Sequence, residues 1–148
     1  MKNLLLPYYF KIFGIVLLLA GIAMAIFYIW FDFRFTIPVF AVYSVFFETK
    51  IFEVFRTNFA DELTLLVLIC GLGLIVFSKQ KNEWAGLDFI RFKALSLAVI
   101  ANTVFLLLSV IFVYGSGFMG MLVINVISLF VFYLIIFLLI KRKKSSGL

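Results

Sequence analysis

The sequence predicts an all-α integral membrane protein, a four-helix bundle with an outer amphipathic or interfacial segment between spans 1 and 2. Of its 148 residues, 66% are hydrophobic, and the mean hydropathy is +1.26. A soluble domain of this size cannot bury so much apolar surface. Four apolar runs without charge alternate with connections that carry the charged residues, which gives the number of spans. We therefore expect residues 1–148 to form a single membrane domain.

The first span is expected at residues 12–31, because no charged residue lies between Lys11 and Asp32. A helix of this length rises roughly 30 Å, enough to cross the hydrocarbon core. Gly14, Gly21 and Ala25 repeat at helical spacings, so they are candidates for a small-residue face that lets another helix approach closely. The alternative is ordinary span composition.

The outer segment, residues 32–60, is crowded with aromatic side chains. From Phe31 to Ile37 apolar residues alternate with polar ones, which indicates a short extended stretch. For residues 39–59 we expect a helix in the outer interface or a short re-entrant element, and the β-branched and aromatic bias leaves a β-hairpin open. A fifth span is disfavoured, because it would bury Glu48, Lys50 and Glu53 at roughly 2.5–3.5 kcal/mol each.

The remaining spans are expected at 61–77, 94–114 and 118–140. Asn58 and Asp61 are residue types that cap helix N-termini, which favours a helix start there. Residues 78–93 form an inner connection, the glycine-rich run 115–120 predicts a tight turn, and the basic tail 141–148 ends the fourth span.

The orientation follows from the basic residues. The N-terminus, the inner connection and the C-terminal tail hold two, four and four Lys or Arg residues, whereas the outer connection, counted from Asp32 to Glu62, holds three. Five of the seven carboxylates lie in the outer connection. Because basic residues accumulate on the cytoplasmic side, both termini are expected in the cytoplasm.

Several kinds of chemistry lack the residues they need. The chain has no histidine, which excludes His-ligated haem and histidine bases, and its single cysteine, Cys70, excludes an intramolecular disulfide. No carboxylate, lysine or arginine lies in the four charge-free runs, whereas a proton-coupled pump normally needs one there. We expect no catalytic residue, no metal and no cofactor. The basic residues flank spans, so we assign them to lipid headgroups and not to nucleic acid.

A few polar residues lie inside the predicted spans, and they are the candidates for a polar intramembrane site. They are Asn102, Ser109, Asn125, Ser128 and Tyr133. Depths counted from the inner edge predict the pairs Asn125–Ser109 and Asn102–Tyr133, and predict that the two asparagines do not meet. Such residues either hold helices together or line a path for a substrate or ion.

A second set lies in the outer connection and is the candidate for an outer-face interaction site. It consists of Tyr43, Glu48, Lys50, Glu53, Asp61 and Glu62. The carboxylates could bind a cation or a basic partner, but their spacing matches no metal motif. The alternative is a solvated rim with helix-capping carboxylates.

Short stretches of the chain resemble a family of small four-span membrane proteins of Bacteroidota-type bacteria. They are IPVFAVYS (37–44), ETK (48–50), ADE (60–62), FSKQK (77–81) and Ser96-Leu97. The resemblance covers roughly residues 30–140. It implies four spans and a bacterial inner (cytoplasmic) membrane, and it implies no catalytic or binding residue. Residues 84–86 depart from the acidic composition typical of the family at that place.

The function expected from these features is that of a non-enzymatic membrane protein, an accessory or sensor-like subunit or partner of another membrane protein. One alternative is a small homo-oligomeric transporter or channel with Asn102 and Asn125 lining a polar path. Another is an intramembrane enzyme that acts on lipid through Glu48 and Glu53. The expected partners are the lipid bilayer and another membrane protein or a second copy of the chain.

Overall fold

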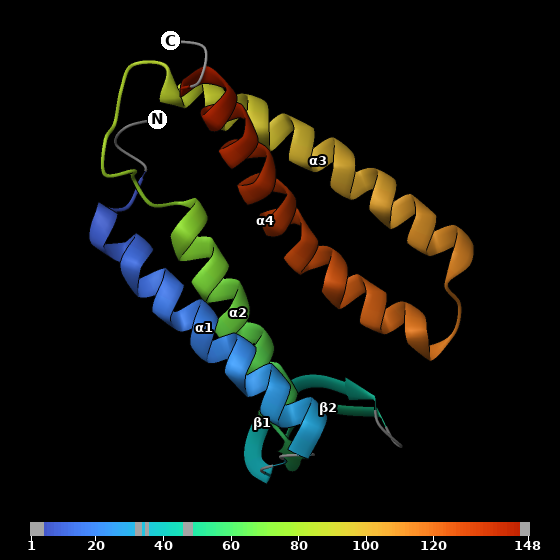
Figure 1. Ribbon diagram of the computed structural model, residues 1–148. Helices are drawn as coiled ribbons and strands as arrows, with labels where there is room; N and C mark the ends of the chain where they lie inside the picture. Colours follow the sequence, from blue (N-terminus) through green and yellow to red (C-terminus); the bar gives the residue numbers. More distant parts are fainter. Residues whose placement is uncertain (1–4, 32–33, 35, 46–48, 146–148) are drawn as a thin grey trace.

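Two helix pairs and one β-hairpin make up the fold in the computed structural model, which describes residues 5–31, 34, 36–45 and 49–145. In chain order the elements are α1 (Tyr8–Phe31), β1 (Thr36–Val45), β2 (Thr49–Asn58), α2 (Ala60–Val76), α3 (Leu87–Phe112) and α4 (Ser116–Ser145). α1 packs along α2, and α3 packs along α4 (Figure 1). The pairs meet where α2 touches α4. The start of α1 and the end of α4 lie at one end of the molecule, and the hairpin lies at the other.

The helices confirm the predicted all-α class. Three of them, over residues 8–31, 87–112 and 117–144, are long and apolar enough to cross a membrane. α2 has 17 residues and rises about 25 Å, slightly less than a typical hydrocarbon core. Large apolar side chains are exposed along the long helices, for example Leu19, Leu107 and Leu139. A surface of this kind is suited to lipid and not to water.

The preferred prediction for residues 39–59, an interfacial helix or re-entrant element, is wrong. Residues 39–45 and 49–58 belong to the antiparallel strands β1 and β2, with Phe40 opposite Val54 and Pro38 opposite Arg56. The hairpin that the sequence left open is therefore present, and β-branched and aromatic residues supply the strand preference. Pro38 is tolerated because each strand of a two-stranded sheet has an unpaired edge. Of the alternating stretch 31–37, Asp32, Phe33 and Phe35 lie outside the described residues.

α1 and α2 approach closely through glycines. A Cβ at Gly71 would come within 2.8 Å of the backbone nitrogen of Leu18, and one at Gly14 within 2.9 Å of the carbonyl oxygen of Gly71. Gly21 fits against Leu68 in the same way. Gly14 and Gly21, two of the three residues of the expected small-residue face, thus pack against α2.

α3 and α4 are joined by the three residues Val113, Tyr114 and Gly115. Gly115 has φ +69°, a left-handed conformation that glycine adopts without strain. Near the opposite end of this pair, buried side chains form the main hydrophobic cluster. Its members are Leu87, Ile90, Ala94, Ala98, Tyr133 and Phe137. Both helices extend beyond the predicted spans, because α3 begins at Leu87 and α4 continues to Ser145.

The connection between α2 and α3 is fastened to the start of the chain. Leu6 N donates to Phe77 O and Lys79 N donates to Leu6 O, both at 2.9 Å, which makes a parallel bridge between Leu6 and Ser78. The Lys144 ammonium lies 4.6 Å from the centre of the Trp84 ring, within the range of a cation–π contact. The connection therefore binds both the N-terminal segment and the end of α4.

Candidate functional site

Three of the predicted intramembrane residues form one hydrogen-bonded cluster between α3 and α4. Asn102 Nδ2 donates to Asn125 Oδ1 at 3.1 Å. Ser128 Oγ lies 2.6 Å from Asn102 Oδ1 and 2.9 Å from the carbonyl oxygen of Asn125. Asn125 Nδ2 makes a longer contact, 3.4 Å, to the backbone oxygen of Asn102. The polar groups of the cluster are thus bonded to one another, as in a contact that holds two helices together.

The predicted pairs Asn125–Ser109 and Asn102–Tyr133 are wrong, and the two asparagines do meet. The prediction placed the inner ends of the two spans at the same depth, which they do not share. The short turn aligns the two helices instead. Asn102 lies ten residues before the end of α3, and Asn125 lies nine residues after the start of α4. At 1.5 Å per residue, both are about 14–15 Å from the turn.

Ser109 and Tyr133 have other surroundings. Ser109 is buried and donates to the carbonyl oxygen of Phe105 at 2.8 Å, within its own helix. Tyr133 belongs to the hydrophobic cluster and stacks on Phe137 with ring centres 5.9 Å apart.

The outer-face candidates do not gather in one described site. Asp61 and Glu62 are exposed in the first turn of α2, where negative charge suits the helix dipole. Glu48 lies outside the described residues, and so do the side chains of Tyr43, Lys50 and Glu53. Asn58 Oδ1 accepts a hydrogen bond from Ala60 N at 3.3 Å, which supports the start of α2.

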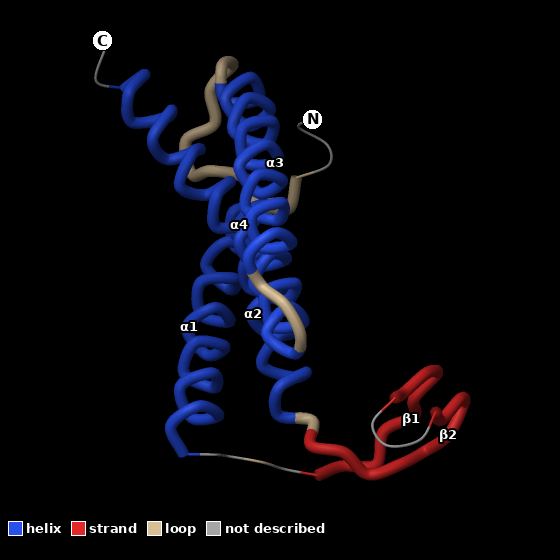
Figure 2. Tube along the Cα trace, turned by 90° about the vertical axis from the view of Figure 1, so that its right-hand side faces the viewer, coloured by secondary structure: helices blue, strands red, loops and turns tan. Residues whose placement is uncertain are grey.

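The hairpin carries an exposed apolar face. Phe40 and Val54 are cross-strand partners with side chains 63% and 61% exposed. Pro38 and Arg56, the partners beside them on the same face, are exposed as well. Figure 2 shows the hairpin extending sideways from the ends of α1 and α2. Phe40, Val54, Pro38 and Arg56 thus form one exposed face of the hairpin.

A polar site that the sequence reasoning missed lies at the opposite end, around Arg91. Arg91 is 6% exposed, and its guanidinium binds both carboxylate oxygens of Glu83, with Nη1–Oε2 3.1 Å and Nη2–Oε1 2.5 Å. Nη1 also lies 3.2 Å from Asp88 Oδ1. The hydrogen bonds from Arg91 lower the pKa of Glu83 below its ordinary value, although partial burial acts in the opposite direction. This two-point contact orients Arg91 and keeps its buried charge neutralised.

Two lysines converge beside this pair. Lys11 Nζ donates to Gln80 Oε1 at 2.9 Å, and Lys141 Nζ reaches the same oxygen at 3.5 Å. Gln80 N in turn donates to Glu83 Oε1 at 2.8 Å. α1, α3, α4 and the α2–α3 connection are therefore joined in one polar network. Among the described residues, no carboxylate forms an ion pair with Lys11 or Lys141.

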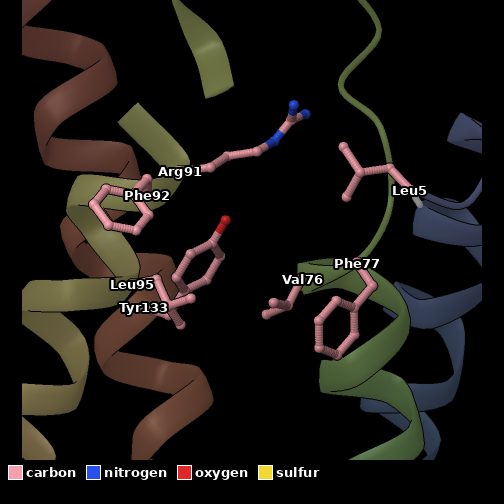
Figure 3. A pocket seen from close by; sticks show the side chains of 7 residues that line it. All are labelled: Leu5, Val76, Phe77, Arg91, Phe92, Leu95 and Tyr133. Atoms are coloured by element: carbon pink, nitrogen blue, oxygen red, sulfur yellow. The ribbon is translucent and has the colours of Figure 1, made fainter. Parts of the chain in front are cut away.

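Two cavities adjoin this network, and both are lined by Val76, Arg91 and Tyr133. The first has a volume of about 280 Å³, and Figure 3 shows Arg91 extending across it with the Tyr133 hydroxyl pointing toward the guanidinium. It is completed by Leu5, Phe77, Phe92 and Leu95. The second, about 170 Å³, adds polar groups to an apolar wall. Its remaining lining residues are Lys11, Ile75, Ser78, Gln80, Leu134, Phe137 and Leu138.

Only a small part of this site can be predicted from the sequence. Asp88 and Arg91 have the spacing of an ion pair on one helix. Lys11 and Lys141 are separated from Gln80 by 69 and 61 positions, and no local pattern relates such distant residues. Within the described part of the chain, no group of three or more Cys, Asp or Glu residues could hold a metal ion.

Comparisons with models of known protein families, with curated proteins and with solved structures gave no match. The assignment of function therefore depends on the chain itself.

Proposed function

We propose that this chain is a non-enzymatic, multi-pass protein of a bacterial inner membrane that acts as an accessory or sensor-like partner of another membrane protein. The outer hairpin is the docking element. The observation that carries the proposal is the exposed face formed by Phe40 and Val54 on a hairpin that extends away from the helices (Figure 2).

A two-stranded hairpin is marginally stable alone in water, and it needs a third strand or a packed face. Within the described part of the chain, β1 and β2 form a two-stranded sheet, and the outer edge of a strand is where another strand can add. An extended segment that adds to such an edge gains backbone hydrogen bonds, while side chains such as Phe40 and Val54 give specificity. The favoured partner therefore presents an extended segment close to the membrane surface.

The short α2 supports this location. With about 25 Å of rise, α2 holds its first residue, Ala60, near the edge of the hydrocarbon core. The hairpin ends at Asn58, so it lies at headgroup level in this arrangement. The basic residues concentrate at the opposite end, which favours cytoplasmic termini and an outer hairpin.

The alternative, a homo-oligomeric transporter or channel, gains no support from Asn102 and Asn125. A polar path needs groups free to bind its substrate, whereas these amides bond to each other and to Ser128. The two cavities described above are lined by other residues.

The docking proposal is tested by placing a photo-crosslinking amino acid at position 40 or 54 in the full-length protein in its native membrane. We expect one discrete adduct, identified by mass spectrometry as a peptide of another integral membrane protein. The same probe at position 107, an exposed site on α3, is the matched control and should give no such adduct.

A second arm uses the double variant F40S/V54S, which should lower copurification of that partner about tenfold or more, as loss of central apolar contacts does. L107S is its control. Failure of positions 40 and 54 to give a protein adduct would refute the proposal. An adduct with a second copy of this chain alone would favour a homo-oligomer instead.

A further inference from the structure

The end of the molecule that carries both termini combines a cationic centre with apolar cavities. Lys11 and Lys141 share one neutral acceptor, Gln80 Oε1, and no described carboxylate pairs with either ammonium. Bringing two like charges to one amide oxygen is unfavourable unless an anion compensates them. The nearby Arg91 does not need that anion, because Glu83 and Asp88 bind it.

The surface below the lysines is apolar. In the second cavity, Lys11 and Gln80 lie toward the end of the helices, while Leu134, Phe137 and Leu138 continue along α4 toward the membrane centre. Five of the seven side chains that line the first cavity are apolar, and two of these, Phe77 and Phe92, are 56% and 61% exposed. It therefore opens to the surroundings of the helices and is not sealed inside the protein.

From this juxtaposition we propose that the cavity pair is a binding site for one anionic phospholipid. The phosphate binds between Lys11 and Lys141, and an acyl chain lies along the cavities beside Val76 and Tyr133. Charge-assisted hydrogen bonds from two ammonium groups suit a phosphate oxygen. The depth order of the site, with cations at the helix ends and apolar side chains deeper, matches the order of headgroup and chain in a leaflet.

The cavity volumes fit only part of an acyl chain. Pockets that enclose a whole ligand occupy about 300–1,000 Å³, and the cavities have about 280 and 170 Å³. Toward the hairpin end the α1–α2 and α3–α4 pairs diverge (Figure 1), so the rest of the acyl chain can continue into the bilayer. This site lies at the opposite end from the hairpin, and the proposal does not depend on the docking partner.

The test is native mass spectrometry of the full-length, delipidated protein in detergent, titrated with phosphatidylglycerol or with phosphatidylcholine of identical chains. We expect one tightly retained phosphatidylglycerol and weaker phosphatidylcholine binding. The variant K11Q/K141Q should bind phosphatidylglycerol about 10- to 30-fold more weakly, on the scale of two lost lysine contacts. R142Q/K143Q removes the same charge from exposed side chains at the end of α4. Because salt screens exposed charges, this variant should change the affinity less than about threefold.

A second variant tests the part of the site that holds the acyl chain, and it removes no charge. Leu138 lines the second cavity and is 59% exposed, so L138F should narrow the cavity and leave the fold intact. We expect it to weaken phosphatidylglycerol binding, with an unchanged melting curve by circular dichroism. If K11Q/K141Q and R142Q/K143Q weaken binding equally, the lipid is held by general surface charge and the proposal fails. If inorganic phosphate raises the melting temperature as much as the lipid does, a free anion is the ligand and the lipid assignment is wrong.

Discussion

The side-chain amide of Asn102 donates to the side-chain oxygen of Asn125 at 3.1 Å, and this bond joins α3 to α4. Ser128 Oγ completes the cluster at 2.6 Å from Asn102 Oδ1. Hydrogen bonds between membrane helices contribute about 0.6 kcal/mol on average and up to about 1.7 kcal/mol.

Replacing Asn102 by leucine should therefore lower the free energy of unfolding by about 1 kcal/mol, because Asn125 and Ser128 both lose a partner. Reversible unfolding in mixed detergent micelles measures the change. T103V is the control, since the Thr103 hydroxyl donates only to Val99 O in its own helix. Equal stability of N102L and the wild type would show that the cluster does not hold the helices together.

The contact between α1 and α2 gives a second prediction. A methyl group at Gly71 would meet the backbone of Leu18 at 2.8 Å, so G71A must push the helices apart. Overpacking of this kind costs about 1–3 kcal/mol. G73A is the matched control, because nothing lies within 4 Å of a Cβ there, and alanine should stabilise the helix by up to about 1 kcal/mol. Opposite shifts in melting temperature are the expected result, and a tolerated G71A would contradict the close packing.

The Glu83–Arg91 pair predicts an acid-sensitive fold. The pKa of Glu83 is lowered in the folded state, chiefly by the hydrogen bonds from Arg91, so folding favours the carboxylate. Its contribution to stability is complete above the ordinary pKa of 4.5 and is lost as the pH falls through the lowered value. Melting temperatures of wild type and E83Q, measured from neutral to acidic pH, should differ most near neutrality and converge in acid. A constant difference across that range would exclude Glu83 as the titrating group.

The proposed orientation predicts the labelling of single cysteines in a C70S background. D61C, in the exposed first turn of α2 next to the hairpin, should react with a membrane-impermeant maleimide in intact spheroplasts. K143C, at the end of α4, should react only after the membrane is permeabilised. The reverse pattern would show that the termini are outside, and labelling of both cysteines in intact spheroplasts would indicate mixed orientations.

The sequence predicted the helices well because a charge-free apolar run is a direct consequence of lipid as solvent. The hairpin was harder, because residues 39–59 combine aromatic and β-branched side chains that suit both a strand and an interfacial helix. The Asn102–Asn125 contact was missed because the depths of the two residues were counted from the inner ends of their helices. The short turn at Gly115 joins the opposite ends, so the two helices are aligned at the turn. The lysine site was beyond prediction, since Lys11 meets Gln80 only after α1 and α2 have packed.

The backbone bridge between Leu6 and Ser78 closes the first half of the chain into a ring that contains α1, the hairpin and α2. Since α3 and α4 are held together by their own turn and asparagine cluster, each half has an internal closure. The exposed bond between Lys81 and Asn82 is therefore the place to divide the chain, because Glu83 and Trp84 then stay in one polypeptide with Arg91 and Lys144. The two halves, expressed as separate polypeptides, should reassemble.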